Sequence, residues 1–268
     1  MRLRLIKDAN RHGYVEPLRV RLVIVGLGGT GGYAFYHLAR LAASLKGEAD
    51  WQVVLADGDV VEERNLVRQN FTASDVGRPK VECLARRYGD AYGMAVPYWP
   101  RYVEEEAVLA RLLGGEIMGF EPGLPVLVGC VDNNATRRLF HRVFEAWEGP
   151  LVYVDSGNDE WSGQVVLGAK TVKGVVLPPV GHYYPDILED DDPLPGELSC
   201  SELAAASPQN IATNVLAGAL VFGLLNGLLG GDGIETYGAT FSARTGQVRA
   251  LWIEELPETP GWPFWAEK

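Results

Sequence analysis

Short apolar runs alternate with amphipathic stretches through the first 160 residues. Apolar runs bounded by glycine or aspartate predict buried strands, and apolar positions three or four residues apart predict helices. The pattern predicts strands at 18–27, 51–56, 95–98, 125–131 and 151–156, and helices at 30–46, 78–88, 104–113 and 134–147. This alternation predicts an α/β fold with a Rossmann-like, doubly wound and mostly parallel sheet.

The second part of the chain has a different pattern. Residues 163–176 predict further strands, and residues 235–253 predict a hairpin around 243–246. Between them lie a segment rich in proline and acidic residues, 177–199, and a helix predicted from about 208 to 229. Long irregular segments in compact domains are usually functional or mobile. We therefore expect an antiparallel C-terminal extension of the sheet, preceded by a functional loop.

Charge and cysteine content narrow the class of protein. The chain has 268 residues and a net charge of −11, and its adjacent basic residues form only pairs, at 86–87 and 137–138. These features argue against nucleic acid and anionic membrane surfaces as partners. Three cysteines without a Cys-x-x-Cys spacing and four scattered histidines indicate neither a disulfide framework nor a zinc site.

Two further features bear on location. The N-terminal residues are too polar for a signal peptide, which together with the low cysteine count predicts a cytoplasmic protein. The most apolar stretch, 215–229, contains Asn226 and is shorter than a membrane span. It predicts a buried helix and no membrane association.

Glycines follow the first predicted strand in a nucleotide-binding spacing. Gly26, Gly28 and Gly31 form G-x-G-x-x-G, with Gly29 beside them, between a strand and a helix. In this context the glycines permit a tight turn and the helix N-terminus presents free N–H groups to a phosphate. A glycine-rich turn without a ligand is the alternative. The motif alone does not separate a nicotinamide or flavin enzyme from one that uses ATP.

Acidic residues end the second predicted strand. Asp57 lies 31 positions after Gly26, where a carboxylate commonly accepts hydrogen bonds from ribose hydroxyls. Asp59 follows it in Asp57-Gly58-Asp59. The alternative for Asp57 is a turn-forming residue with no ligand.

Polar and cationic side chains after Asp57 favour ATP. Asn65, Arg68 and Gln69 stand close together, and Lys80 follows in a second cluster. Arginine and lysine give charge-assisted contacts to a triphosphate. Adenylyl transfer needs such contacts because charge builds on the leaving pyrophosphate, whereas hydride transfer does not. A solvated helix face is the alternative for these cations.

Asp132 follows the predicted strand at 125–131. Ligands of open α/β sheets lie at the carboxyl ends of strands, so this carboxylate is placed to hold the magnesium ion that accompanies ATP. The alternative is that Asp132 caps the following helix. We expect Cys130 and Cys83 to serve packing.

These motifs occur in a recognisable order. D-x-D-x-V-x-x-x-N-L-x-R-Q at 57–69, V-G-x-P-K at 76–80 and C-x-D-N-x-x-x-R at 130–137 resemble the ThiF/MoeB/HesA superfamily, which includes the ubiquitin-activating enzymes. The resemblance covers residues 23 to about 138 and is weaker at 155–163 and 200–229.

The resemblance implies specific roles. Catalysis is expected from Arg68, Lys80, Asp132 and Cys200, with magnesium on Asp132. Nucleotide binding is expected from Gly26, Gly28, Gly29, Gly31, Asp57, Asp59, Asn65, Arg68, Gln69 and Lys80. The implied reaction is Mg-ATP-dependent adenylation of the C-terminal carboxylate of a small ubiquitin-like or sulfur-carrier protein that ends in Gly-Gly. Cys200 is placed to accept the acyl group, or to be a small residue at a helix start. A homodimer is also implied.

The chain departs from the family pattern in two ways. The zinc-binding Cys-x-x-Cys pairs are absent, and the N-terminal arginine that reaches into a neighbouring subunit has only Arg2, Arg4 and Arg11 as candidates. The composition is reminiscent of the PRTRC-system subfamily.

We expect a single domain over 1–268, with a nucleotide-binding part at about 18–160, a crossover loop at about 177–207 and a C-terminal helix and hairpin at about 208–256. A non-catalytic ATP-binding scaffold and an NAD-dependent oxidoreductase are the rival functions.

Overall fold

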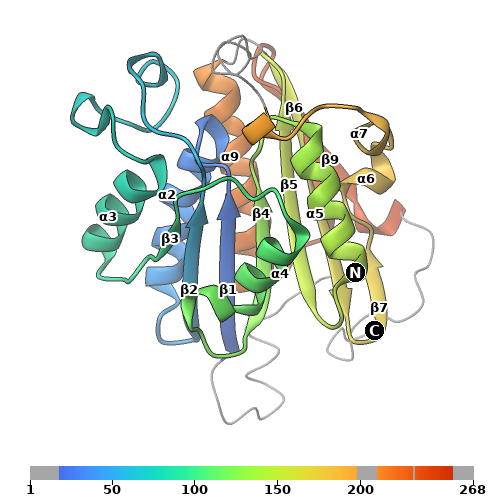
Figure 1. The fold of residues 1–268 in the computed structure, drawn as a ribbon. Helices are drawn as coiled ribbons and strands as arrows, with labels where there is room; N and C mark the ends of the chain where they lie inside the picture. The colour runs from blue at the N-terminus through green and yellow to red at the C-terminus, as the bar shows by residue number, and fades with distance from the viewer. Residues whose placement is uncertain (1–17, 198–209, 232, 256–268) are drawn as a thin grey trace.

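The computed structural model describes residues 18–197, 210–231 and 233–255. In this part of the chain, nine strands form one sheet in the order β3-β2-β1-β4-β5-β6-β8-β9, and β7 pairs with β6 off this path (Figure 1). The strands are β1 (Leu18–Val25), β2 (Ala49–Ala56), β3 (Tyr98–Trp99), β4 (Leu124–Gly129), β5 (Leu151–Asn158), β6 (Ser162–Thr171), β7 (Gly174–Leu177), β8 (Thr236–Ser242) and β9 (Gln247–Trp252).

Strand direction divides the sheet into two parts. The five strands from β3 to β5 pair in parallel, while β6, β7, β8 and β9 join by antiparallel pairs. This confirms the predicted fold class, a mostly parallel sheet with an antiparallel C-terminal extension. The third strand lies at Tyr98–Trp99, later and shorter than the predicted 95–98, because it forms only two pairs with β2.

Helices cover both faces of the sheet. Figure 1 shows α4 and α5 in front of it, with α2 and α9 behind. The helices are α2 (Gly29–Ser44), α3 (Lys80–Tyr92), α4 (Glu106–Gly114), α5 (Asn134–Ala146), α6 (Val180–Tyr183), α7 (Asp186–Glu189) and α9 (Ile211–Leu225). The segment predicted as an irregular loop after residue 177 therefore contains two short helices. It also contains a 3₁₀ turn at Pro195–Glu197.

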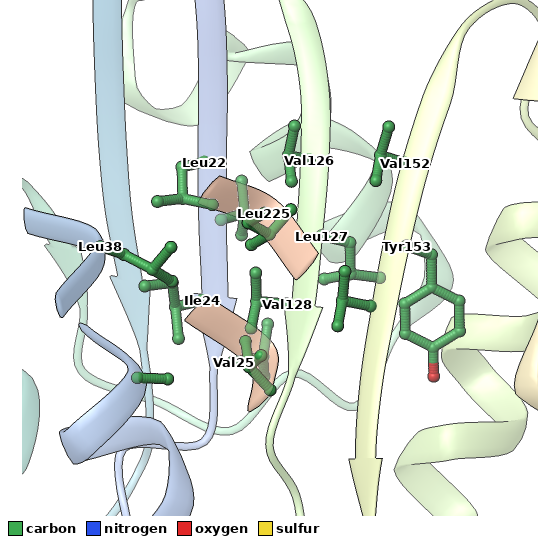
Figure 2. Close-up of a cluster of buried hydrophobic side chains, with 14 of the residues drawn as sticks. Leu22, Ile24, Val25, Leu38, Val126, Leu127, Val128, Val152, Tyr153 and Leu225 are labelled. Carbon is green, nitrogen blue, oxygen red and sulfur yellow. The ribbon is translucent and has the colours of Figure 1, made fainter. Parts of the chain in front are cut away.

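The core lies where the central strands are buried on both faces. The apolar runs at 22–25 in β1 and 124–128 in β4 are typical of parallel strands covered by helices on each side. Figure 2 shows Leu38 of α2 and Leu225 of α9 among side chains from β1, β4 and β5. The carboxyl ends of these buried strands lie at one end of the sheet. The predicted site is at that end.

Helix α9 is longer than the apolar run at 215–229 suggested. By length and composition alone, the 20 residues Ile211–Gly230 could cross a membrane, so the sequence-based expectation that the run is too short was wrong. These residues form α9 and a π-helical turn. Helix α9 packs against α2, and its Ala217, Val221 and Leu225 are fully buried. We therefore assign it as a core helix.

Candidate nucleotide-binding site

The glycine turn is built so that only glycine fits at two positions. Gly26 has a φ of +87°, and a Cβ added there would lie 2.6 Å from the Cys130 carbonyl oxygen. A Cβ on Gly31 would lie 1.8 Å from the Gly26 carbonyl oxygen. Within the described residues no side chain caps α2 at Gly28. The first N–H groups of α2 therefore suit an anion brought close to the backbone.

Asp57 joins the end of β2 to this turn. Its Oδ2 accepts a 2.5 Å hydrogen bond from the Leu27 N–H, and its Oδ1 accepts a 2.8 Å bond from the Asp59 N–H. Burial raises the pKa of Asp57 to about 6, although the nearby Lys80 charge opposes this. The carboxylate predicted to hold the ribose thus lies directly beside the glycine turn.

Lys80 is a buried cation held against Asp59. Its side-chain Nζ donates a 2.6 Å hydrogen bond to Asp59 Oδ2, and the residue is only 4% exposed. Burial disfavours the charged ammonium, but the carboxylates of Asp57 and Asp59 outweigh it and hold the pKa of Lys80 above its ordinary value. Helix α3 begins at Lys80, two residues later than predicted, because Pro79 is its N-cap.

Asn65 and Gln69 differ in what their side chains do. Asn65 Oδ1 accepts a 2.9 Å hydrogen bond from the Glu62 N–H, so it caps a 3₁₀ turn at Glu63–Asn65. Gln69 is buried, and its Oε1 has no hydrogen-bond partner among the described residues. Its Nε2 lies 3.6 Å from the position that a Cβ on Gly28 would take. An acceptor without a partner beside the glycine turn suits a ligand that donates a hydrogen bond.

The negative charge of Asp132 acts on Arg68. Burial lowers the pKa of the half-buried Arg68, and the Asp132 charge opposes that change. The same Asp132 charge acts on Lys80 and on Tyr102. Asn133, rather than Asp132, caps α5, because its side chain accepts a 2.8 Å hydrogen bond from the Thr136 N–H. The capping alternative for Asp132 was therefore wrong, and its carboxylate is exposed.

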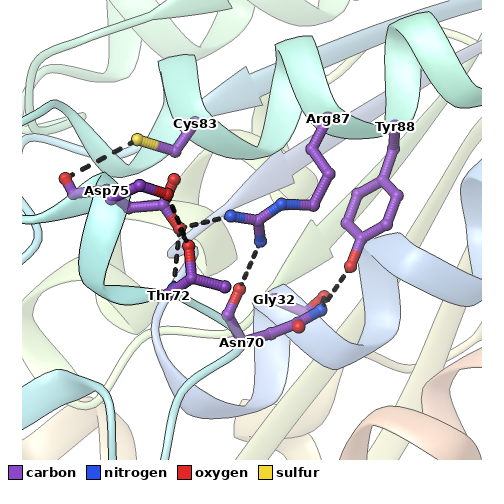
Figure 3. Close-up of polar contacts among 8 residues, drawn as sticks. Gly32, Asn70, Thr72, Asp75, Cys83, Arg87 and Tyr88 are labelled. Atoms are coloured by element: carbon purple, nitrogen blue, oxygen red, sulfur yellow. Dashed lines mark hydrogen bonds and ion pairs between the residues drawn. The ribbon is translucent and has the colours of Figure 1, made fainter.

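Polar contacts hold the loop that carries Arg68 and Gln69. Figure 3 shows Arg87 of α3 paired with Asp75 and donating a 2.8 Å hydrogen bond to the Asn70 carbonyl. The Asn70 Nδ2 donates a 2.6 Å hydrogen bond to the Tyr88 hydroxyl (Figure 3). These contacts fix the segment 70–75 on α3 and so position the preceding residues.

A model of the ThiF family matches residues 2–258. The chain belongs to the ThiF family. This confirms the family resemblance drawn from the ordered motifs.

Two curated relatives are similar in sequence to about half of this chain. The sulfur carrier protein ThiS adenylyltransferase of Escherichia coli K12 is 30% identical over 149 residues, which are 55% of this chain and 53% of that protein. The SAMP-activating enzyme E1 of Haloferax volcanii is 31% identical over 150 residues, 56% of this chain and 50% of that enzyme. The chain thus spans about half the length of these relatives.

Solved structures share the fold. PaaA matches with a TM-score of 0.58 and 17% identity, over 87% of this chain and 73% of PaaA. The structure of Escherichia coli MccB with ATP matches with a TM-score of 0.52 and 15% identity, over 87% of this chain and 63% of MccB. At these identities the likeness concerns the ThiF-type fold alone.

The described site does not include every residue considered in the sequence analysis. Cys200 and the candidate arginines Arg2, Arg4 and Arg11 lie outside the described residues. Cys83 is buried, and its thiol donates to the Asp75 carbonyl oxygen at 3.9 Å (Figure 3). Burial raises the pKa of Cys83 and Cys130, which disfavours the thiolate form.

Two residues at the candidate site were not predicted from the sequence. Tyr102, in the loop after β3, donates a hydrogen bond to Asp59 Oδ1. Asn214 is fully buried in α9, and its Nδ2 donates a 3.4 Å hydrogen bond to the Arg68 carbonyl oxygen. Asn214 directly precedes the apolar run at 215–229, and a polar residue at the start of a buried helix is the available hint, because it needs a hydrogen-bond partner.

A hollow of about 450 Å³ lies away from these residues. Its lining comes from α5, β7, α6 and α7, and includes His141, Glu145, Pro178 and Leu188. None of the residues predicted from the sequence lines it. The candidate nucleotide site is instead the glycine turn, to which Asp57 is hydrogen-bonded.

Proposed function

We propose that this chain is a Mg-ATP-dependent adenylyltransferase of the ThiF family. Its substrate is the C-terminal carboxylate of a small ubiquitin-like or sulfur-carrier protein that ends in Gly-Gly. One observation supports the proposal: Asp57 is hydrogen-bonded to the glycine turn, and the buried Lys80 is bonded to Asp59 two residues later. The Asp132 charge acts on both Lys80 and Arg68. The names of the ThiS and SAMP relatives support the same substrate class.

Each side chain has a role in the proposed reaction. The carrier carboxylate attacks the α-phosphate of ATP, an acyl-adenylate forms, and the bond to pyrophosphate breaks. Lys80 and Arg68 neutralise the charge that builds on the leaving pyrophosphate. Asp57 accepts hydrogen bonds from the ribose, and the N–H groups at Gly28 and Gly29 approach the phosphates. The protein thus acts mainly by positioning and charge stabilisation.

Asp132 suits magnesium as a ligand. Mg²⁺ takes oxygen ligands and is usually bound by one or two carboxylates together with substrate phosphates. Asp132 offers an exposed carboxylate at the carboxyl end of β4, and the cap of α5 does not use it. When bound there, the metal would neutralise phosphate charge during adenylyl transfer.

Finer features rest on the family resemblance. We propose one adenylation domain that works as a homodimer in the cytoplasm, with a cross-subunit arginine among Arg2, Arg4 and Arg11. Cys200 is proposed to accept the acyl group after adenylation. Membership of the PRTRC-system subfamily rests on composition alone.

ATP–pyrophosphate exchange with small Gly-Gly carriers tests the proposal. We expect exchange that depends on the carrier and disappears when its terminal Gly-Gly is removed. A Cys200→Ala protein should keep exchange and lose any thioester. ATP binding without exchange for every carrier tried would favour a scaffold instead, and NADH binding without ATP binding would favour an oxidoreductase.

A further inference from the structure

One carboxylate links a tyrosine to the buried lysine. Asp59 Oδ2 accepts a 2.6 Å hydrogen bond from Lys80 Nζ, and Asp59 Oδ1 accepts a hydrogen bond from the Tyr102 hydroxyl. Tyr102 is 43 positions from Asp59 and belongs to none of the family motifs in this sequence. The three side chains form a chain of contacts in which Asp59 is the middle member.

The ring of Tyr102 is fixed by the backbone beneath it. A Cβ added to Gly58 would lie 2.7 Å from the Tyr102 Cγ, so the ring lies on the backbone between Asp57 and Asp59. Glycine at this position permits that approach. Burial and the hydrogen bond to Asp59 raise the pKa of the Tyr102 hydroxyl, so it stays protonated and donates.

The proposed reaction brings Lys80 from Asp59 to the phosphates of ATP. In the structure its ammonium is bonded to Asp59, whereas the proposed reaction needs it at the phosphates. A carboxylate that loses its cation in a partly buried place is costly unless other donors remain. Tyr102 is such a donor, because its hydroxyl contacts the oxygen of Asp59 that Lys80 does not use.

We infer that Tyr102 is a positioning residue for Lys80, acting through Asp59, which it stabilises while the lysine moves to the nucleotide phosphates. The inference rests on the proposed function, since it assigns Lys80 to ATP. Without the hydroxyl, Asp59 would keep only Lys80 and water as direct partners, since its side chain is 41% exposed, and it would hold the lysine more tightly away from the phosphates.

Tyr102→Phe tests this inference because it keeps the ring on Gly58 and removes only the hydroxyl. Calorimetry should show ATP affinity falling by roughly 10- to 150-fold, the range expected for one hydrogen bond to a charged group. Adenosine affinity should stay within about twofold, because adenosine has no phosphate for Lys80 to contact. Tyr98→Phe, at an exposed tyrosine on β3, is the matched control and should change neither affinity.

A double-mutant cycle separates this role from a direct contact with the nucleotide. In an Asp59→Asn background the carboxylate charge is gone, so Tyr102→Phe should have little further effect on ATP affinity. An equal loss in both backgrounds, or no loss in either, would overturn the inference. Circular dichroism checks that each variant is folded.

The cycle also separates this inference from the proposed function. The cycle needs only ATP binding, so it can support the role of Tyr102 even when no carrier supports pyrophosphate exchange. Those two results together would count against adenylation and leave the role of Tyr102 standing. Carrier-dependent exchange together with unchanged ATP affinity in Tyr102→Phe would leave adenylation standing and refute the role of Tyr102.

Discussion

Asn214 of α9 lies directly against Gly29 in the glycine turn. A Cβ added to Gly29 would fall 2.0 Å from the Asn214 Nδ2. The same amide contacts the Arg68 carbonyl oxygen and accepts a 3.3 Å hydrogen bond from Asn158 Nδ2. Helix α9 therefore holds together three segments that converge at the nucleotide site: the glycine turn, the loop of Arg68 and the end of β5.

Gly29→Ala should disturb this junction. The added methyl group forces Asn214 away, and overpacking of this kind costs about 1–3 kcal/mol of the free energy of unfolding. We also expect weaker ATP binding because the turn and α9 move apart. Urea unfolding and calorimetry measure the two effects.

Two variants control this experiment. Gly47→Ala adds the same methyl group where nothing lies within 4 Å, so it should leave both quantities nearly unchanged. Asn214→Ala combined with Gly29→Ala removes the clash and should recover part of the lost stability. Equal stability of Gly29→Ala and Gly47→Ala would show that the junction is not tight.

The positions of the glycine turn and of Asp57 in the fold could be predicted from local sequence patterns. The glycine turn and Asp57 follow from strand-turn-helix patterning, because local spacing alone places them at the carboxyl ends of β1 and β2. The contacts of Tyr102 and Asn214 could not be predicted, since they join positions 43 and 146 residues apart. Whether Asp132 capped α5 was also open, because aspartate is a good helix cap as well as a ligand.

Arg68→Ala and Asp132→Ala should each abolish most carrier-dependent pyrophosphate exchange. Removal of one group that stabilises transition-state charge commonly costs about 10²- to 10³-fold in rate. Asp90→Ala, at an exposed acidic residue on α3, is the matched control and should retain full activity. Full exchange in either Arg68→Ala or Asp132→Ala would remove that residue from the proposed site.

The ion pair between Arg137 and Asp155 should matter for stability. Arg137 Nε lies 3.3 Å from Asp155 Oδ1, and the side chains are 10% and 0% exposed. Asp155→Asn leaves a buried guanidinium without its counter-charge and should cost about 3–5 kcal/mol of the free energy of unfolding. Asp50→Asn breaks the more exposed pair with Arg19 and should cost less than about 1 kcal/mol. Similar losses in the two variants, measured by urea unfolding, would contradict this ranking.

Asp57 should give stability an unusual pH dependence. Burial raises its pKa from an ordinary value of 3.8 to about 6, so the folded state binds this proton more tightly than the unfolded state. The contribution of this group to the free energy of unfolding is therefore full below pH 3.8 and is lost as pH rises through about 6. Asp57→Asn has no such proton, so its stability relative to the wild type should rise by roughly 1–3 kcal/mol between pH 4 and 6.5. Parallel curves for the two proteins in urea unfolding at several pH values would show that the carboxyl group has an ordinary pKa in the folded protein.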